Sequence, residues 1–292
     1  MTGGGGLVGT DLRRHLIKSG HEIISLERNQ LERGDGARSV YCDLRQGIVS
    51  IPDNLGAIDA VIHNAACISA GSTAAETQLL YKVNVAASKD LLNWSIAQGV
   101  SKFIFTSSLS QLAKPLPTLI TEDASVYPVT YYAQTKKMFE DELTMAAKEG
   151  KIQSVILRIS SPISIMAENL PKNIIGKWIN LARAGRPLTI FGSGNRTQDF
   201  VCTLDIADAV EKMLFLNQSD VFNICSGQPV SMLEIAKLIC AYFENGIEFE
   251  GDDQLEDERW TISIQKAIDK INYAPKWDGI KALKALLGAF PR

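Results

Sequence analysis

A cluster of glycines at the start of the chain constrains its fold more than any other feature of the sequence. Gly3, Gly6 and Gly9 recur at regular intervals, and residues 7–19 then carry apolar side chains at helical spacing. Such a turn lets the backbone approach a phosphate closely and presents free N–H groups at a helix N-terminus, where the helix dipole favours negative charge. The spacing therefore predicts a binding site for the pyrophosphate of a dinucleotide. The residues predicted to contact it are Gly3, Gly6, Leu7 and Val8.

The strand that should precede this turn is missing. In dinucleotide-binding folds a buried strand leads into the glycines from the middle of the sheet, whereas only Met1 and Thr2 precede Gly3 here. Its loss would leave backbone groups unpaired on two neighbouring strands, at about 1–3 kcal/mol each if buried. Each buried aliphatic side chain lost with it would cost roughly 1.5–3 kcal/mol. We therefore expect a short apolar strand ahead of Met1 in the functional protein.

The first half of the chain alternates strand-like and helix-like patterns. Strands are expected at five apolar stretches, residues 22–26, 39–42, 57–63, 102–106 and 153–159. Helices are expected over residues 7–19 and 76–98 and from Tyr131 onward. This alternation predicts an α/β fold with a parallel, doubly wound sheet of the Rossmann type that lacks its first strand.

The pattern changes after Arg158, where turn residues separate shorter elements. We expect residues 1–160 to form a dinucleotide-binding domain and residues 161–292 a smaller α/β lobe that binds the substrate. The lobe is expected to be partly interleaved with the first domain, with residues 199–226 returning to it. Within the lobe, Ser231 is expected to cap a helix, because Glu234 stands in capping-box register.

Composition argues against several classes of function. A net charge of −3 gives no electrostatic footprint for nucleic acid or for an anionic membrane. No apolar run approaches the length of a membrane span, and we expect no metal site. The five cysteines form no CxxC pair and are odd in number, which is typical of free thiols in a reducing compartment. A cytoplasmic location is therefore expected.

An acidic residue after the second strand-like stretch bears on the choice of dinucleotide. Glu27 lies 24 positions after Gly3, close to the spacing at which a carboxylate accepts hydrogen bonds from an adenosine ribose. Such a carboxylate favours NAD, because it would repel the 2′-phosphate of NADP. The neighbouring Arg28 leaves NADP open, because an arginine can accommodate that phosphate.

Tyr132 and Lys136 form the pair that we expect to carry the chemistry. They stand four residues apart on an expected helix and so share one of its faces. An ammonium group beside a phenol is expected to lower the pKa of the phenol, which would make Tyr132 a proton acceptor near neutral pH. Ser108 follows a strand at the carboxyl edge of the sheet, where open α/β sheets bind ligands. We expect it to hydrogen-bond the same substrate oxygen.

In this order the motifs resemble the extended short-chain dehydrogenase/reductase family, and within it the NAD-dependent branch of nucleotide-sugar epimerases and dehydratases. The resemblance covers nearly the whole chain. Residues 2–9 resemble a TGxxGxxG turn, residues 61–66 a VIHxAA strand end, and residues 132–140 a YxxSKxxxE helix. Later in the chain, residues 190–205 resemble a G-x-G…RDFxxVxD segment and residues 221–227 a VYNxGSG segment.

This resemblance implies roles for individual residues. Tyr132 would remove a proton from a sugar hydroxyl, Lys136 would hold the nicotinamide ribose, and Ser108 would polarise the oxygen. Cofactor contacts are implied for Asp43, Leu44, His63, Ala65, Ala66 and Asn84, in addition to Glu27, Arg28 and Lys136. Substrate contacts are implied for Ser160, Asn173, Arg196 and Gln198. A homodimer is also expected.

Departures from the family's pattern narrow the expected function. Gln198 takes the place of an arginine expected to touch the diphosphate, although Arg196 lies on the same strand face. Leu109 and Ser110 cannot supply the Asp-Glu pair that dehydratases use to eliminate water, which argues against 4,6-dehydratase activity. We therefore expect a sugar epimerase or a 4-keto-sugar reductase that uses NAD. Two alternatives stay open, a reductase of a non-nucleotide carbonyl substrate and a non-catalytic cofactor-binding protein of the same fold.

We predict that about six β-branched residues placed ahead of Thr2, the length of an ordinary strand, raise the melting temperature and tighten cofactor binding. The added strand would pair backbone groups in the middle of the sheet and bury apolar side chains. Calorimetry and NAD⁺ titration of both chains check this. Cooperative melting and micromolar NAD⁺ binding by the 292-residue chain, with no gain from the extension, would contradict it.

Overall fold

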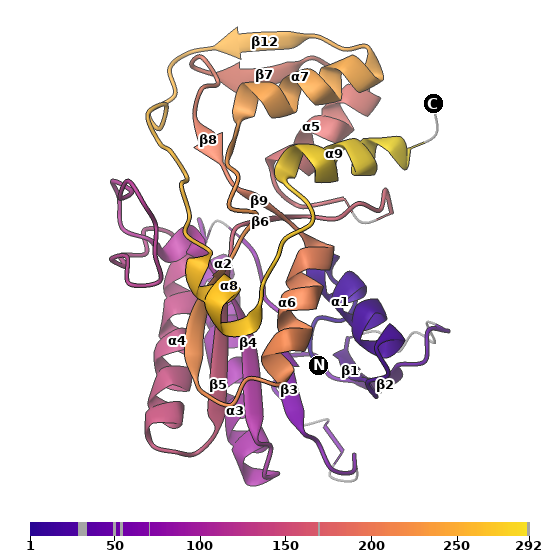
Figure 1. Cartoon of the computed structure of the whole chain (residues 1–292), viewed down its shortest axis with the longest axis vertical. Helices are drawn as coiled ribbons and strands as arrows, with labels where there is room; N and C mark the ends of the chain where they lie inside the picture. The colour runs from indigo at the N-terminus through magenta and orange to yellow at the C-terminus, as the bar shows by residue number, and fades with distance from the viewer. Residues whose placement is uncertain (29–33, 49–50, 53–54, 70, 169, 291–292) are drawn as a thin grey trace.

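The protein folds into two lobes, a larger one around a parallel sheet and a smaller one above it (Figure 1). The computed structural model describes residues 1–28, 34–48, 51–52, 55–69, 71–168 and 170–290. Within these ranges no helix is both long and apolar enough to cross a membrane. The cytoplasmic location stays a prediction.

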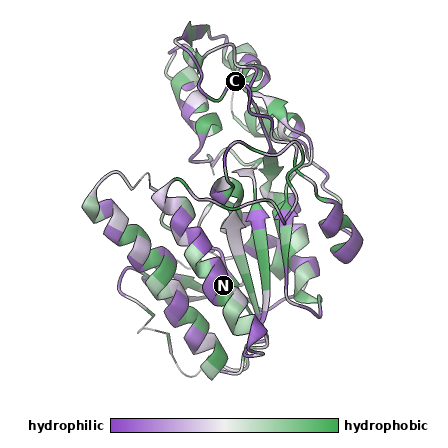
Figure 2. Ribbon diagram, turned by 90° about the vertical axis from the view of Figure 1, so that its left-hand side faces the viewer, coloured by the Kyte–Doolittle hydropathy of each residue, from purple (hydrophilic) through white to green (hydrophobic). Residues whose placement is uncertain are grey.

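The sheet of the large lobe is parallel throughout, which confirms the predicted fold class. Its strands lie in the order β2-β1 and β3-β4-β5-β10, with Thr2 between β1 and β3. These strands are β1 (Ile24–Glu27), β2 (Arg38–Tyr41), β3 (Ala60–His63), β4 (Lys102–Ser108), β5 (Gln153–Ile159) and β10 (Asp220–Ile224). Their arrows point toward the small lobe, so their carboxyl ends face it (Figure 2).

Helices cover both faces of this sheet, which explains why its strands are apolar almost without interruption. On β4, Phe103 and Phe105 pack toward α3 and α4, whereas Ile104 between them packs toward α1 and α6. The helix expected over residues 76–98 is divided by one π-helical turn, η1. The helices and short turns of this lobe are α1 (Leu7–Lys18), α2 (Ala74–Tyr81), η1 (Lys82–Ala86), α3 (Ala87–Ala97), η2 (Leu109–Gln111), α4 (Tyr131–Lys148), α6 (Thr203–Leu214) and α8 (Gln265–Ile271).

Met1 and Thr2 occupy the middle of the sheet. Thr2 forms parallel bridges with Leu26 on one side and with His63 on the other. Its N–H donates to Ile62 O at 2.9 Å, and Met1 O accepts from Leu26 N–H at 2.8 Å. The place of the strand expected before the glycines therefore exists in the fold, and these two residues lie in it.

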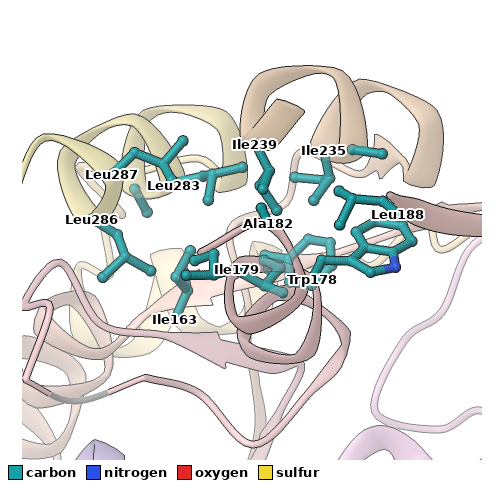
Figure 3. Packing of buried hydrophobic residues seen from close by; sticks show 14 of the residues in the cluster. Ile163, Trp178, Ile179, Ala182, Leu188, Ile235, Ile239, Leu283, Leu286 and Leu287 are labelled. Atoms are coloured by element: carbon teal, nitrogen blue, oxygen red, sulfur yellow. The ribbon is translucent and has the colours of Figure 1, made fainter. Parts of the chain in front are cut away.

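The small lobe is built around a separate core from helices, a parallel strand pair of β7 and β12 and a short antiparallel pair of β8 and β11 (Figure 1). In that core, α5, α7 and α9 turn aliphatic side chains toward one another, and Trp178 lies beside Leu188 (Figure 3). The predicted capping box is confirmed, because Ser231 Oγ accepts from Glu234 N–H and the Glu234 carboxylate accepts from Ser231 N–H. The elements of this lobe are α5 (Ile174–Arg183), β7 (Leu188–Phe191), β8 (Thr197–Gln198), β11 (Val230–Ser231), α7 (Met232–Phe243), β12 (Ile247–Glu250) and α9 (Gly279–Gly288).

The chain crosses between the lobes several times. The parallel pair of β6 (Ser161–Ile163) and β9 (Phe200–Cys202) links them. After β9, α6 packs on α1 and β10 pairs with β5, so this stretch lies in the large lobe. Later, α8 also packs on β10, which the sequence patterns did not indicate. The division of the chain at residue 160 stays a prediction.

Candidate active site

The glycine turn fits tightly against its surroundings. Gly3 has a φ of +69°, and a Cβ atom there would lie 2.8 Å from the backbone nitrogen of Ala65. A Cβ atom on Gly9 would lie 1.9 Å from Gly3 O, so only glycine is tolerated there. Gly6 caps α1 without any side-chain hydrogen bond, which leaves the N-terminus of that helix available to an anion. These features fit a dinucleotide pyrophosphate lying across the turn.

The structure brings Glu27 to the glycine turn. Glu27 is buried at the end of β1, where Ser25 Oγ donates to Glu27 Oε1 at 2.7 Å. A Cβ atom on Gly4 would lie 3.1 Å from the same carboxylate oxygen, which shows how closely the two segments approach. Arg28 is exposed next to it. The position suits a carboxylate that binds the adenosine ribose.

Asp43 has a partner that the sequence patterns did not reveal. Its Oδ2 accepts from Arg45 Nη2 at 2.6 Å and from Arg45 Nε at 2.9 Å. These hydrogen bonds hold the pKa of Asp43 below its usual value, with a smaller contribution from the charge of Arg28. Arg45 therefore compensates the charge of this carboxylate, which lies near the place expected for the adenosine of the cofactor. The contact of Asp43 with the cofactor stays a prediction.

The ring of His63 has a structural role, and the expected contact of His63 with the cofactor stays a prediction. The side chain is fully buried, with Nδ1 2.8 Å from Thr2 Oγ1 and Nε2 2.8 Å from Ser88 Oγ. Ser88 Oγ donates to Val83 O and so accepts from His63, which places the proton on Nε2. Burial and the charge of Lys136 lower the pKa of His63 to about 3, so the ring is neutral.

The side chains of Asn84 and Leu44 make contacts inside the protein. Asn84 Oδ1 accepts from Cys67 N–H at 2.7 Å, and Asn84 Nδ2 donates to Cys67 O and to Thr135 Oγ1. Asn84, which lies in the π-helical turn, thus fixes the loop after Ala66 to α4. Leu44 is buried in the core. The contacts of Asn84 and Leu44 with the cofactor stay predictions.

Lys136 joins the helix of the expected catalytic pair to the central strand. Its Nζ donates to Thr106 O on β4 at 2.8 Å and lies 4.6 Å from the centre of the Phe105 ring. The same Nζ lies 5.9 Å from the centre of the Tyr132 ring. Burial lowers the pKa of Lys136 to about 7, although the charge of Glu140 opposes this shift. Burial therefore disfavours the charged form of this amine in the folded protein.

The expected activation of Tyr132 by Lys136 is not present. Burial raises the pKa of Tyr132 to about 12, against the lowering that was expected. The physical reason is that Lys136 Nζ is directed at Thr106 O and is itself partly neutral. Ser108 ends β4 and caps η2, and its Oγ donates to Ser110 Oγ at 2.9 Å. Ser108 and Tyr132 therefore stand at the same carboxyl edge, on β4 and on the first turn of α4.

Two residues predicted to bind substrate are bonded within the protein. Ser160 is buried and its Oγ donates to the carboxylate of Asp199, and its contact with the substrate stays a prediction. Gln198 Nε2 donates to Ser161 Oγ, and its side chain is only partly buried. The same Asp199 carboxylate accepts from the N–H and the Oγ of Ser226. These bonds fix the crossing of β6, β9 and β10.

Arg196 is paired with Asp253 at 3.3 Å, and sequence reasoning missed this acid. The acidic run from Asp252 to Glu258 was visible in the sequence, but nothing there showed that it lies against the loop of Arg196. Within the described part of the chain, no group of three or more His, Cys, Asp or Glu residues is arranged to hold a metal ion. The role of Arg196 at a diphosphate stays a prediction.

Asn173 lies apart from the catalytic pair. Its Oδ1 accepts from Ile175 N–H and caps α5, and its Nδ2 donates to Pro162 O at 3.1 Å. It lines a surface groove of about 860 Å³ along α5 that contains none of Ser108, Tyr132 and Lys136. The prediction that Asn173 contacts the substrate therefore stays a prediction.

We predict that Lys136→Met changes how stability depends on pH. The unfolded chain keeps Lys136 protonated up to its usual pKa of 10.5, whereas the folded chain releases the proton near pH 7. Between these values the unfolded state binds more protons, so wild-type stability rises with pH across this window. The full penalty for the buried charge acts below pH 7 and disappears above 10.5. It should be on the order of a few kcal/mol.

The variant lacks this penalty, so its free energy of unfolding relative to wild type should fall as pH rises from 7 to 10.5. The variant also loses the hydrogen bond to Thr106 O, which changes its free energy of unfolding by the same amount at every pH. Urea unfolding at several pH values measures the difference in free energy of unfolding between variant and wild type. Lys137→Met is the control, because Lys137 lies at the surface and pairs with Asp141, and its difference from wild type should not change with pH. If the difference for Lys136→Met does not change with pH either, the folded protein carries no buried charge at Lys136.

Known proteins share both the sequence pattern and the fold. The model of the "NAD dependent epimerase/dehydratase family" matches residues 1–225. A putative UDP-glucose 4-epimerase of Methanocaldococcus jannaschii is 25% identical, over 98% of this chain and 96% of its own length. A UDP-glucose 4-epimerase of Lactobacillus helveticus is 29% identical, over 80% of this chain and 78% of its own length.

Solved structures show the same fold along almost the entire chain. A UDP-glucose 4-epimerase of Thermotoga maritima superimposes with a TM-score of 0.85 at 21% identity, covering 99% of this chain and 97% of that one. A UDP-glucose 4-epimerase of Thermus thermophilus in complex with NAD superimposes with a TM-score of 0.81 at 19% identity, with the same coverage. The predicted family and NAD as cofactor are confirmed by the family match. The chain belongs to the NAD-dependent epimerase/dehydratase family.

Proposed function

We propose that the protein is a hydride-transfer enzyme for a nucleotide-activated sugar, either a sugar epimerase or a 4-keto-sugar reductase. The observation that carries this proposal is the anchoring of Lys136 Nζ on Thr106 O. It brings the helix of Tyr132 against the strand of Ser108, at the edge where the glycine turn also ends. The nucleotide-sugar epimerases among the relatives support the same class of substrate.

Each residue of this edge has a distinct task in the proposal. The N–H groups of the glycine turn would bind the pyrophosphate, Glu27 the adenosine ribose and Lys136 the nicotinamide ribose. Bound NAD⁺ would supply a hydride acceptor and a positive charge that favours the phenolate. Tyr132 would take the proton of the sugar hydroxyl and later return it. Ser108 would hold the same oxygen by a hydrogen bond.

Particular observations favour this proposal over the alternatives. A protein that only binds the cofactor could use the amine of Lys136, but it has no need of the Tyr132 phenol one turn away on the same helix face. A dehydratase needs an acid pair after the serine, whereas Leu109 is buried and Ser110 is an exposed serine. A reductase of a non-nucleotide carbonyl would use the same catalytic residues. Such a reductase would differ only in its substrate, so turnover assays distinguish it from a nucleotide-sugar enzyme.

Incubation with UDP-, GDP- and dTDP-sugars and analysis of the products by NMR test the proposal. Conversion of one sugar to its epimer with catalytic NAD⁺ is expected for an epimerase. Consumption of stoichiometric NADH with a 4-keto-sugar is expected for a reductase. Turnover of simple carbonyl compounds alone would contradict a nucleotide-sugar substrate. Light scattering on the same sample tests the predicted homodimer.

We predict that Tyr132→Phe lowers turnover by roughly 10²-fold or more, the usual contribution of a general acid–base group. NAD⁺ affinity and melting temperature should barely change, because the variant loses only the hydroxyl. Tyr131→Phe removes a hydroxyl from the preceding residue and is the matched control. Residual activity of Tyr132→Phe within a few-fold of Tyr131→Phe would contradict the assignment.

We also predict that NAD⁺ binds more tightly than NADP⁺ and that Glu27→Ala narrows the difference by roughly tenfold. A hydrogen bond to a charged group contributes about 1.5–3 kcal/mol, and 1.4 kcal/mol corresponds to tenfold. Calorimetric titration with both dinucleotides measures the ratio. Glu22→Ala makes the same charge change at an exposed site before β1 and should leave it unchanged. Tighter binding of NADP⁺ by the wild type would overturn the preference.

A further inference from the structure

A buried amide lies between the expected catalytic serine and the expected catalytic helix. Gln111 is the last residue of η2, three positions after Ser108, and its side chain is 0% exposed. Its Nε2 donates to Glu140 Oε1 at 2.5 Å. Its backbone oxygen also accepts from Tyr127 N–H at 3.0 Å, in the segment that leads into α4. The side chain and the backbone of this residue thus bind two parts of the same region.

Glu140 is itself held in place from the other side. It lies on α4 one turn after Lys136, and its Oε2 accepts from Arg158 Nη2 at 2.9 Å. Arg158 stands on β5, and its Nη1 donates to Glu122 O at 2.9 Å. Both members of the ion pair are buried, so the position of this carboxylate is strongly determined. A donor that reaches it is fixed relative to α4 and β5 together.

In the described part of the chain, the Ser108 side chain has hydrogen bonds only within its own turn, whereas its backbone ends β4 and lies in register with Ile159 of β5. Its Oγ donates to Ser110 Oγ at 2.9 Å and accepts from Ser110 N–H at 3.1 Å, both within the same turn. The direction of the hydroxyl therefore depends on the position of η2 as well as on the backbone of β4. Leu109 and Leu112 bury apolar side chains from this segment, and such contacts are not directional. The hydrogen bond of Gln111 supplies a direction, because an N–H donor requires alignment with its acceptor.

We propose that Gln111 is a positioning residue that orients Ser108 toward the substrate oxygen shared with Tyr132, acting through Glu140. This inference rests on the proposed function, because it assumes the roles of Ser108 and Tyr132. Gln111 touches neither cofactor nor substrate in this account. Its amide ties the short turn after β4 to the helix of Tyr132 and Lys136. A shift of η2 by about 1 Å would misplace the Ser108 hydroxyl without unfolding the lobe.

Gln111→Met removes the donor and keeps the length of the side chain, so it is the first test. We expect kcat to fall roughly tenfold to hundredfold, the range for a misplacement of about 1 Å. KM and the affinity for NAD⁺ should stay within about twofold, since neither site includes Gln111. Gln153→Met at the start of β5 is the matched control and should behave as wild type. Should Gln111→Met fail to fold, Gln111→Asn shortens the side chain by one methylene and keeps its polarity.

A double-mutant cycle with Ser108→Ala separates positioning from a general structural effect. If Gln111 acts through Ser108, Gln111→Met should lower kcat by less than about twofold in the Ser108→Ala background. The same fold loss in both backgrounds, or no loss in the wild-type background, would overturn the inference. A loss of NAD⁺ affinity parallel to the loss of kcat would overturn it too.

A crystal structure of Gln111→Met gives a readout that needs no substrate. Ser108 Oγ should move relative to the Tyr132 hydroxyl, while the Glu140–Arg158 pair stays in place. An unmoved Ser108 would refute the positioning role whatever the activity. If the wild type converts none of the sugars, or if Ser108→Ala leaves turnover intact, the proposed function has failed. In those cases the position of Ser108 in the variant alone decides whether Gln111 orients it.

Discussion

The close approach of the glycine turn to the end of β3 is the constraint on which the rest of the site depends. Gly3 lies so near the backbone of Ala65 that a Cβ atom would fall 2.8 Å from its nitrogen. Just below, Thr2 Oγ1 accepts from Ala65 N–H and contacts His63 Nδ1. The backbone packing and the buried polar contacts thus join two loops at one edge of the sheet. These contacts hold together the two turns at which the phosphate and ribose sites are expected.

A second constraint is electrostatic and lies on the opposite side of that edge. Lys136 is buried against the aromatic ring of Phe105, where its charge is disfavoured, and its Nζ has a backbone oxygen as hydrogen-bond acceptor. Glu140 one turn away offsets this penalty in part, but it is itself neutralised by Arg158. A core built for stability alone would place an apolar residue at Lys136. The retained amine is therefore best explained by chemistry at the edge of the sheet.

The sequence predicts the elements far better than it predicts the partners of individual side chains. Alternating apolar patterns and the glycine spacing predicted the sheet, its helices and the capping box of Ser231, because these depend on residues close in sequence. The hydrogen-bond partners of His63 and Asn84 could not be predicted, because a motif shows that a residue is needed at a position and not which atoms it meets. Arg196 illustrates the same limit, since its partner Asp253 lies 57 positions away. The π-helical turn that contains Asn84 has no recognisable pattern in the sequence.

Buried carboxylates explain why several motif residues turn out to be structural. Asp199 accepts from Ser160 and Ser226, which come from the ends of β5 and β10 and so from strands far apart in sequence. In the large lobe, Glu140 accepts hydrogen bonds from Gln111 of η2 and from Arg158 of β5. A carboxylate suits this task because its two oxygens accept several hydrogen bonds at once, and removing one donor leaves a buried acceptor unsatisfied. Such anions fix the segments that follow the strands to the sheet, and through that rigidity they hold the proposed catalytic groups in position.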